Sequence, residues 1–343
     1  MSDNKPRHIV LFGGTGFLGW SFIRVFLESE SFRKRGDRLV CASRRVPESA
    51  QTLENVLWVS VDIADAESVQ GFLSKCFEKE EDRPDMIINA AAVGAPKECD
   101  LSPELSERIN VGLPKQIATT CASVGASVKL VQFSTDMVFG GDAAPYADTA
   151  IPNPLNLYGK QKSEMETSLV PIYPNTLICR VPLLFGESGQ GTRNGWRGID
   201  EQCGRGAVIG LFVDEWRTPI RGLRIAEFIL NCESSLKDVC GVLNVAGPQR
   251  LSRYEMGESV WKVFGYDSSL LTKGNLKERM KEVKEKAKEN SSIVPSDYQR
   301  PEDLSLDSSK AVRLGLKTRS FEEEVREIKE KGGWTQSWGG VRL

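Results

Sequence analysis

Short apolar runs separated by longer amphipathic stretches make up the first part of the chain. Each run ends in glycine or in small polar residues, which indicates a buried strand. The expected strands span residues 9–12, 39–42, 56–61, 86–88 and 129–133, and the expected helices span residues 17–26, 67–78 and 104–124. Because strands alternate with helices, the pattern predicts an α/β fold built on a doubly wound parallel sheet.

The first expected strand ends in a glycine-rich turn that opens the first helix. Gly13, Gly16 and Gly19 have the spacing G-x-x-G-x-x-G. This spacing gives a tight turn, a bare backbone for a pyrophosphate and close packing of helix on strand. The helix N-terminus adds unpaired N–H groups and a partial positive charge. We expect dinucleotide binding, and the alternative is a glycine-rich turn without a ligand. The expected contacts are Gly13, Thr15, Gly16, Phe17 and Leu18.

The residues that follow the second and third strands are placed to select the cofactor. Arg44 and Arg45 stand where NAD-preferring sites commonly carry an acidic residue for the ribose 2′-OH. Guanidinium groups suit a 2′-phosphate by charge and by geometry. We therefore expect NADP(H) rather than NAD(H), and the alternative is a solvated arginine pair. Asp62 and Ile63 follow the third strand, from where a side chain can reach the adenine.

Small side chains follow the fourth strand. Ala90, Ala91 and Ala92 let the ribose and pyrophosphate of a cofactor lie against the sheet edge, and the alternative is that these alanines only start a helix. Asn110, within the expected helix 104–124, can hold the same edge through its amide. These four residues complete the expected contacts of the cofactor with the sheet.

The second part of the chain predicts fewer regular elements. We expect strands near 208–213 and 242–245, helices over 223–230 and 252–264, and a highly charged, solvated helix over 276–289. A Rossmann-type dinucleotide-binding domain is expected over residues 1–180 and 220–246. A smaller substrate-binding lobe is expected over 181–219 and 247–343.

The composition of the chain argues against several classes of function, among them nucleic-acid binding and zinc-dependent catalysis. Lys and Arg number 45 against 47 Asp and Glu, so no broad basic field exists to bind nucleic acid. No apolar run approaches the ~20 residues that span a bilayer, and we expect a cytoplasmic protein without a membrane anchor. The eight cysteines form no C-x-x-C pair and most are expected to be reduced core thiols. His8 is the single histidine, which excludes most zinc sites and every nucleophile that needs histidine.

A proton donor that does not require histidine follows the loop 142–154. Tyr158 and Lys162 are four residues apart on an expected helix, so both side chains project from one face. A nearby ammonium favours the phenolate, and we expect Lys162 to lower the pKa of Tyr158. Thr135, at the end of the fifth strand, can hold a substrate carbonyl by its hydroxyl. A Y-x-x-x-K pair alone is commonly a surface pair. It indicates a catalytic pair here only because it follows the first half of a Rossmann-type domain and a polar strand end.

Several motifs together resemble the extended short-chain dehydrogenase/reductases, and more narrowly the dTDP-4-dehydrorhamnose reductase family. They lie at residues 13–19, 89–92, 134–139, 154–162, 180–186, 217–219, 244–247, 300–301 and 306–310. The resemblance implies that Thr135, Tyr158 and Lys162 are catalytic, that 180–183, including Pro182, borders the nicotinamide, and that the substrate is a nucleotide sugar. It implies NADPH-dependent reduction of a 4-keto group, with Tyr158 as the proton donor. Residues 93–102 and 214–219 depart from the family pattern near the substrate, which leaves the identity of the sugar open.

A second resemblance implies a different class of function. Residues 154–160 and 253–256 are also similar to the regulatory beta subunit of methionine adenosyltransferase, which implies a non-catalytic NADP-binding protein with a partner enzyme. The tail 332–343, with Trp334 and Trp338, is either disordered or docked, and it offers a route to a protein partner. Residues 188–205 are either a flap over the substrate pyrophosphate or a flexible loop without a ligand. The sequence is also compatible with a homodimer.

Overall fold

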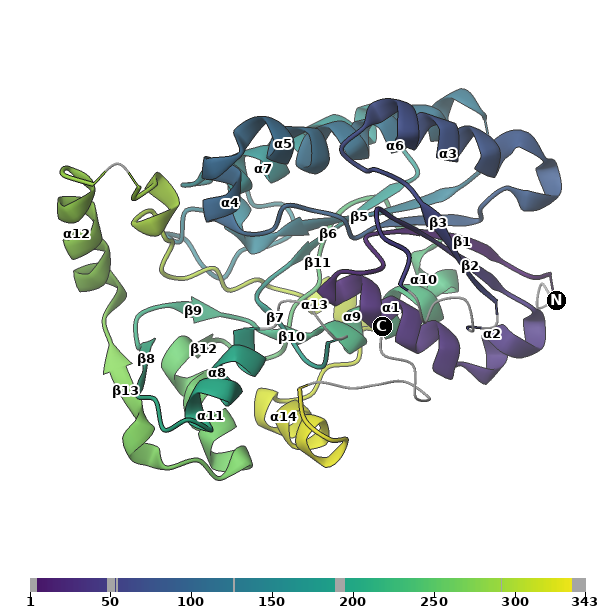
Figure 1. Cartoon of the computed structure of the whole chain (residues 1–343). Helices are drawn as coiled ribbons and strands as arrows, with labels where there is room; N and C mark the ends of the chain where they lie inside the picture. Colours follow the sequence, from purple (N-terminus) through teal and green to yellow (C-terminus); the bar gives the residue numbers. More distant parts are fainter. Residues whose placement is uncertain are drawn as a thin grey trace.

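A seven-stranded sheet, parallel throughout, forms the centre of the computed structural model (Figure 1), which describes residues 5–47, 53, 55–125, 127–188, 195–290 and 292–334. The strand order is β11-β6-β5-β4-β1-β2-β3. The strands are β1 (His8–Phe12), β2 (Arg38–Ser43), β3 (Val56–Ser60), β4 (Met86–Asn89), β5 (Lys129–Thr135), β6 (Thr176–Val181) and β11 (Gly241–Asn244). The α/β class and the doubly wound parallel sheet predicted from the apolar runs are confirmed.

Helices cover both faces of the sheet (Figure 1). One face carries α1 (Phe17–Glu28), α2 (Glu30–Arg35), α9 (Gly222–Asn231), α10 (Glu233–Leu236) and α13 (Ser309–Arg313). The other carries α3 (Ala66–Glu78), η2 (Glu80–Asp82), α4 (Pro96–Leu101), α5 (Pro103–Glu107), the π turn η3 (Arg108–Gly112), α6 (Leu113–Ser123) and α7 (Leu157–Ile172). Each face has its own apolar core, one around Phe22 and Ile225 and the other around Phe72 and Ile117.

The remaining elements form a smaller lobe beside the carboxyl ends of the strands. They are η4 (Asp136–Val138), β7 (Leu184–Phe185), α8 (Gly195–Cys203), β8 (Ile209–Phe212), β9 (Trp216–Arg217), β10 (Ile220–Arg221), β12 (Leu251–Ser252), α11 (Arg253–Phe264), η5 (Ser268–Leu270), β13 (Leu271–Gly274), α12 (Leu276–Ala287), η6 (Pro295–Asp297) and α14 (Phe321–Glu330). A third core, around Trp196, Met256 and Val325, holds most of this lobe together.

Four expectations need correction. The helix predicted over 104–124 is two helices joined by a π turn, and α4, opened by Pro96, was not predicted. The fifth strand extends to Thr135. Ala311 and Leu316, assigned to the smaller lobe, pack into the core beneath the sheet. Part of the glycine-rich stretch 188–205 is helix α8, and residues 189–194 lie outside the described residues.

The tail begins as a docked segment. The Trp334 ring is buried and stacks on Phe264, with ring centroids 5.5 Å apart. The Trp334 carbonyl also accepts a hydrogen bond from the Ser188 N–H, at 3.1 Å. Trp334 therefore docks on the chain's own lobe, whereas Trp338 lies outside the described residues.

Candidate functional site

A cavity of about 630 Å³ opens where the strand order reverses, between β1 and β4. Doubly wound sheets bind ligands at this point, outside the carboxyl ends of the strands. The cavity is lined by Thr15, Gly16, Phe17, Leu18, Ala90, Ala91, Ala92, Gly94, Ala95, Glu98, Phe133, Ser134, Tyr158, Lys162, Val181 and Leu184. The glycine turn, the alanine segment and the Tyr-Lys helix, far apart in the sequence, therefore share one cavity.

Each glycine of the turn has its own steric role. Gly13 has a positive φ of 82°, and a Cβ there would lie 2.7 Å from the Ala91 nitrogen. A Cβ on Gly19 would overlap the Gly13 carbonyl oxygen, so this glycine lets α1 pack closely on the turn. A Cβ on Gly16 would approach only the Gly13 oxygen, at 3.2 Å. Gly16 lines the cavity, so its open side faces the space that a ligand would use.

The end of β2 lies beside the glycine turn. The Thr15 and Ser43 hydroxyls are 3.3 Å apart, and Arg44 and Arg45 follow directly as exposed residues. Neither arginine has an ion-pair partner among the described residues, although neither lines the cavity.

The residues expected at the adenine lie farther along the same edge. Asp62 is exposed after β3, and its carboxylate accepts a hydrogen bond from the Ala64 N–H at 3.1 Å. Ile63 is half-buried beside it, and neither residue lines the cavity.

Asn110, on η3, holds the segment that follows β4 through three hydrogen bonds. Its amide oxygen accepts from the Val93 N–H at 3.0 Å, and its amide nitrogen donates to the Val93 carbonyl at 3.2 Å. The same nitrogen donates to Gln161 Oε1 at 2.9 Å. Gln161 stands directly before Lys162, so Asn110 ties the segment after the alanines to α7.

Helix α7 begins against the end of β5. The Asn156 side chain caps the helix by accepting the Gly159 N–H at 2.9 Å. A Cβ on Gly159 would overlap the Met137 carbonyl oxygen, so only glycine permits this close approach. The approach places Tyr158 close enough to Thr135 for the threonine side chain to influence the pKa of the phenol.

The electrostatics of Tyr158 differ from the expectation. Burial raises the pKa of Tyr158 above its ordinary value, and the nearby Asp136 raises it further, whereas the hydrogen bond with Thr135 lowers it. Burial also raises the pKa of Asp136 to about 6, although Arg217 lowers it. Contrary to the expectation, the pKa of Tyr158 is raised, because burial of the phenol is the largest effect and Lys162 is not among the groups that lower it.

Lys162 is a buried amine that faces the cavity. Its side chain is 2 % exposed and has no hydrogen-bond acceptor among the described residues. Burial lowers the pKa of Lys162 to about 8, and the nearby Glu166 partly offsets this effect. The Glu166 carboxylate forms an ion pair with Arg180 at 2.7 Å and accepts a hydrogen bond from the Ser134 hydroxyl at 2.6 Å. Lys162 is therefore a donor left available to a ligand.

The structure separates predicted site residues that face the cavity from those that support it. Thr135 and Pro182 are buried next to lining residues. Of the expected segment 180–183, Val181 lines the cavity, and so does Leu184, one residue beyond it. The Thr135 hydroxyl donates to Asp136 Oδ1 at 3.1 Å and accepts from the Met137 N–H. Glu98, on α4, lines the cavity and was missed. Pro96, with Glu98 two residues later in the first turn, is the helix-start signal that predicts this element.

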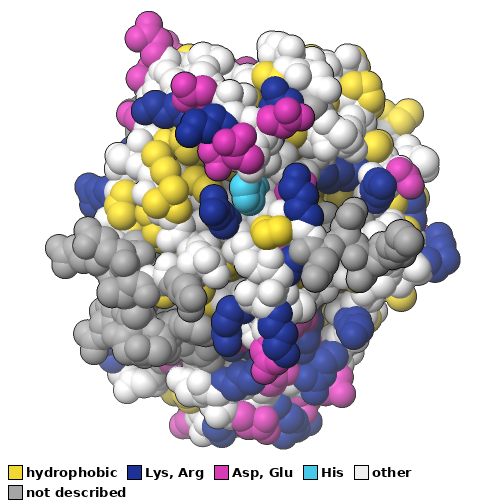
Figure 2. All heavy atoms as spheres, turned by 90° about the vertical axis from the view of Figure 1, so that its right-hand side faces the viewer, with side chains coloured by type: hydrophobic (Ala, Val, Ile, Leu, Met, Phe, Trp, Pro, Cys, Tyr) yellow, Lys and Arg dark blue, Asp and Glu magenta, His cyan; other side chains and the backbone are white. Residues whose placement is uncertain are grey.

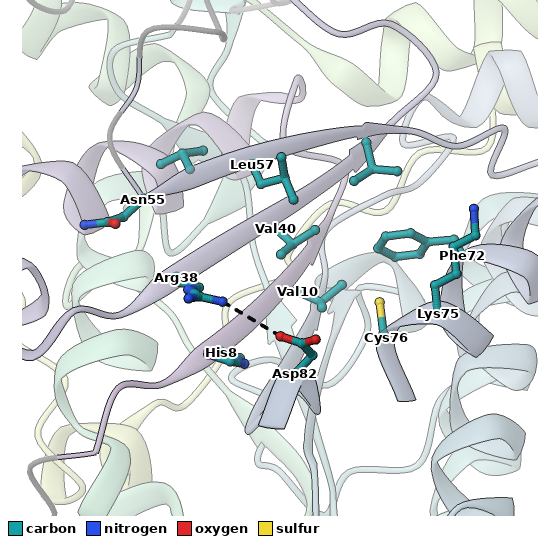
Figure 3. Close-up of a pocket in the computed structure, with 12 residues that line it drawn as sticks. His8, Val10, Arg38, Val40, Asn55, Leu57, Phe72, Lys75, Cys76 and Asp82 are labelled. Carbon is teal, nitrogen blue, oxygen red and sulfur yellow. Dashed lines mark ion pairs between the residues drawn. The ribbon is translucent and has the colours of Figure 1, made fainter. Parts of the chain in front are cut away.

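A second cavity, of about 570 Å³, lies at the opposite, amino ends of the strands. Figure 3 shows Val10, Val40 and Leu57 of the strands facing Phe72 and Cys76 of α3. Burial raises the pKa of Cys76 to about 11, so the thiol stays protonated at neutral pH. On this face of the molecule, basic and acidic side chains intermingle around the single histidine (Figure 2). We assign no chemistry to this second cavity.

Other classes of site find no support in the part of the chain that the structure describes. It contains no group of three or more His, Cys, Asp or Glu residues that could hold a metal ion. None of its helices is long and apolar enough to cross a membrane. All eight cysteines are free thiols, and five of them are buried.

The parallel sheet, the glycine turn and the Tyr-x-x-x-Lys helix around one cavity define the extended short-chain dehydrogenase/reductase class. Within it, the chain belongs to the family described as the RmlD substrate binding domain, whose model matches residues 7–332.

The relatives include a protein named as a subunit of another enzyme and solved structures named as reductases. Methionine adenosyltransferase 2 subunit beta of the mouse, Mus musculus, is 26% identical over 339 residues, which cover 94% of this chain and 86% of that protein. A dTDP-4-dehydrorhamnose reductase structure from Clostridium acetobutylicum is similar with a TM-score of 0.72 and 22% identity, covering 94% of this chain and 98% of that one. A Bacillus anthracis dTDP-4-dehydrorhamnose reductase in complex with NADP has a TM-score of 0.71 and 18% identity, covering 95% and 99%. At these identities, the likeness to the two solved structures shows the shared fold.

Proposed function

We propose that this chain is an NADPH-dependent reductase of a 4-keto nucleotide sugar, with Tyr158 as the proton donor. One observation carries the proposal: Tyr158 and Lys162 line the same cavity as the glycine turn, at the switch point of the sheet. The family supports a substrate of the nucleotide-sugar type, and the solved relatives named as dTDP-4-dehydrorhamnose reductases support the particular reaction.

The residues at the cavity fit a nicotinamide dinucleotide. Gly16 leaves room for a pyrophosphate next to the N-terminus of α1, where backbone N–H groups attract an anion. Arg44 and Arg45 favour the 2′-phosphate of NADPH over NADH by charge. The amine of Lys162, which has no acceptor among the described residues, is available to the ribose hydroxyls. When bound, NADPH supplies the hydride that adds to the carbonyl carbon.

The raised pKa of Tyr158 suits a reductase. In the reductive direction the substrate oxygen gains a proton as its carbon gains the hydride, so the tyrosine must begin as a phenol. Burial and the nearby Asp136 keep it in that form. The Thr135 hydroxyl, next to Tyr158, is placed to orient the carbonyl. After the transfer, the charged Lys162 stabilises the phenolate until solvent returns a proton.

The test follows NADPH loss when the purified chain is mixed with a dTDP-4-keto-6-deoxy sugar. We expect turnover in the wild type, slower turnover with NADH, and a loss of about 10² to 10⁴-fold in Tyr158→Phe. Tyr173→Phe is a matched control, because Tyr173 lies at the other end of α7, does not line the cavity, and its hydroxyl contacts the backbone of Val128. Equal activity in Tyr158→Phe and wild type would contradict the proposed proton donor.

The mouse relative, named as a subunit of methionine adenosyltransferase 2, favours a second candidate function. In that case the chain binds NADP and a catalytic partner without reducing a sugar. A methionine adenosyltransferase catalytic subunit that co-elutes with the chain in a fixed ratio, together with no sugar-dependent NADPH oxidation, would replace the reductase proposal. Sugar-dependent oxidation that requires Tyr158 would reject this candidate.

A further inference from the structure

The hydroxyl of Thr135 has one proton, and the neighbouring carboxylate of Asp136 takes it. The Thr135 hydroxyl donates to Asp136 Oδ1 at 3.1 Å and accepts from the Met137 N–H at 3.2 Å. Because a hydroxyl is a donor only once, this arrangement leaves Thr135 no proton for the oxygen of a substrate carbonyl. Thr135 can therefore hold a carbonyl only after its hydrogen bond with Asp136 has changed.

Asp136 is placed to make this change by taking up a proton. The residue is 3 % exposed, and its Oδ2 is buried without a hydrogen-bond partner among the described residues. An unpaired buried oxygen costs more on a charged carboxylate than on a neutral acid. A proton on Oδ1 reverses the hydrogen bond: the acid donates to the Thr135 oxygen, and the hydroxyl proton of Thr135 is released toward the cavity side.

The titratable and charged groups around Asp136 come from two directions. Burial raises the pKa of Asp136 to about 6, Arg217 on β9 lowers it, and Glu215 beside β9 raises it. Tyr158 faces Asp136 from α7. The pKa of Tyr158 is raised by burial first and by Asp136 second, so this side chain stays a phenol when Asp136 is neutral.

Arg217 determines which oxygen of Asp136 takes the proton. Its Nε lies 3.5 Å from Oδ2. Its other nitrogens donate to Glu215 and to the backbone carbonyls of Trp216, Pro301 and Glu302, which fixes the guanidinium. A positive charge beside Oδ2 favours a carbonyl oxygen there over an O–H group. The proton therefore goes to Oδ1, which faces Thr135.

We propose that Asp136 is a positioning residue whose protonated form frees the Thr135 hydroxyl to hold the substrate carbonyl. The proposal rests on the proposed function, because it states which form of the site is competent for reduction. In the ionised form, Tyr158 is still a donor to the carbonyl oxygen and Thr135 is not. Loss of one donor to an oxygen that gains charge in the transition state slows a reaction by about 10² to 10³-fold. The Asp136 proton stays in place during turnover, so Tyr158 remains the proton donor.

The pH dependence of kcat tests the proposal, with NADPH and a dTDP-4-keto-6-deoxy sugar saturating at each pH. We expect the wild-type kcat to fall about tenfold for each pH unit above about 6. In Asp136→Asn the amide oxygen suits the Arg217 side, and the NH₂ group is a donor to Thr135 that does not titrate. This variant should have a level profile from about pH 5.5 to about pH 8 and exceed the wild-type kcat about tenfold or more at the alkaline end.

Two further comparisons separate this hydrogen bond from a general effect of charge. Thr135→Val removes the hydroxyl, so its kcat should be low and no longer fall above about pH 6, whereas Thr135→Ser keeps the hydroxyl and should keep the fall. Asp82→Asn is the matched control, because Asp82 is 47% exposed, pairs with Arg38 at 3.8 Å and lies at the amino ends of the strands (Figure 3). It should keep the wild-type profile.

Three results would overturn the inference: a level wild-type profile, an Asp136→Asn profile that falls as the wild type does, and a Thr135→Val profile that does the same. Each of them leaves the reductase proposal in place. The wild-type and Thr135 profiles decide the matter even if Asp136→Asn does not fold. Absence of sugar-dependent NADPH oxidation at every pH tested is a different outcome, which rejects the reductase and this role of Asp136 with it.

Discussion

At the scale of single residues, the environment of Tyr158 and Lys162 decides what the pair can do. Spacing on a helix indicates that the two side chains are neighbours, but burial sets both protonation equilibria. Tyr158 is held as a phenol, and the pKa of Lys162 is lowered to about 8. The pair therefore starts as an acid beside an amine whose charge is sensitive to mildly alkaline pH.

We predict that NADPH binding weakens as the pH rises through about 8. The group has a lowered pKa, so Lys162 is an ammonium below that pH and a neutral amine above it. The neutral form attracts the cofactor less. Fluorescence titration of NADPH from about pH 6 to about pH 10 measures the effect.

Lys162→Arg provides the control for this pH dependence. A guanidinium stays charged throughout the range, so the variant should lose the fall near pH 8, whatever its affinity at neutral pH. If the variant shows the same fall as the wild type, another group titrates, and the role given to Lys162 is wrong.

At the scale of elements, the start of α7 against η4 is the contact that assembles the site. The Asn156 cap fixes the first turn of the helix, and Gly159 lets that turn touch the Met137 carbonyl. The position of Tyr158 against Thr135 depends on this contact. A change at Gly159 should therefore affect both stability and activity.

We predict that Gly159→Ala destabilises the fold by about 1 to 3 kcal/mol, because the added methyl group overpacks the contact with Met137. Activity should fall as well, since Tyr158 moves with the helix. Gly71→Ala is the matched control: Gly71 lies within α3 and a Cβ there meets nothing within 4 Å. Alanine should stabilise that helix by about 0.5 to 1 kcal/mol. Urea unfolding measures both, and equal shifts would refute the close-contact explanation.

At the scale of the whole molecule, buried ion pairs join the helix layer below the sheet to the smaller lobe. Arg221 is fully buried, pairs with Glu187, and contacts Glu324 of α14 at 2.8 Å. Arg24 of α1 also contacts Glu187, at 2.9 Å. The C-terminal helix is thereby fastened to α1 and α9 by charge as well as by apolar packing.

We predict that Glu324→Gln lowers the free energy of unfolding by about 3 kcal/mol, because it removes one partner of a buried charge. Glu322→Gln, on the same helix, should cost less than about 1 kcal/mol, since its pairs with Lys262 and Arg326 lie at the surface. Thermal or urea unfolding compares the two variants. Similar losses would show that the buried pairs contribute no more than surface pairs.

Local patterns in the sequence were enough to predict the sheet, its first helices and several residues that share the main cavity. Apolar runs of strand length, glycines at fixed spacing and a Tyr-x-x-x-Lys pair are local patterns, and local sterics and periodicity are enough to interpret them. Thus β1 to β5, α1 and α3 lie within a few residues of their predicted positions. The glycine turn and Tyr158 also share a cavity, as the topology of a doubly wound sheet implies.

The protonation states and the supporting contacts of the site follow from the folded arrangement and not from local patterns in the sequence. The pKa of Tyr158 depends on burial and on Asp136, neither of which the spacing of Tyr158 and Lys162 reveals. Asn110 reaches Gln161 across 51 residues of sequence, and Arg300 contacts Glu215 across 85. Desolvation and long-range contacts are properties of the folded arrangement, so no local pattern in the sequence contains them.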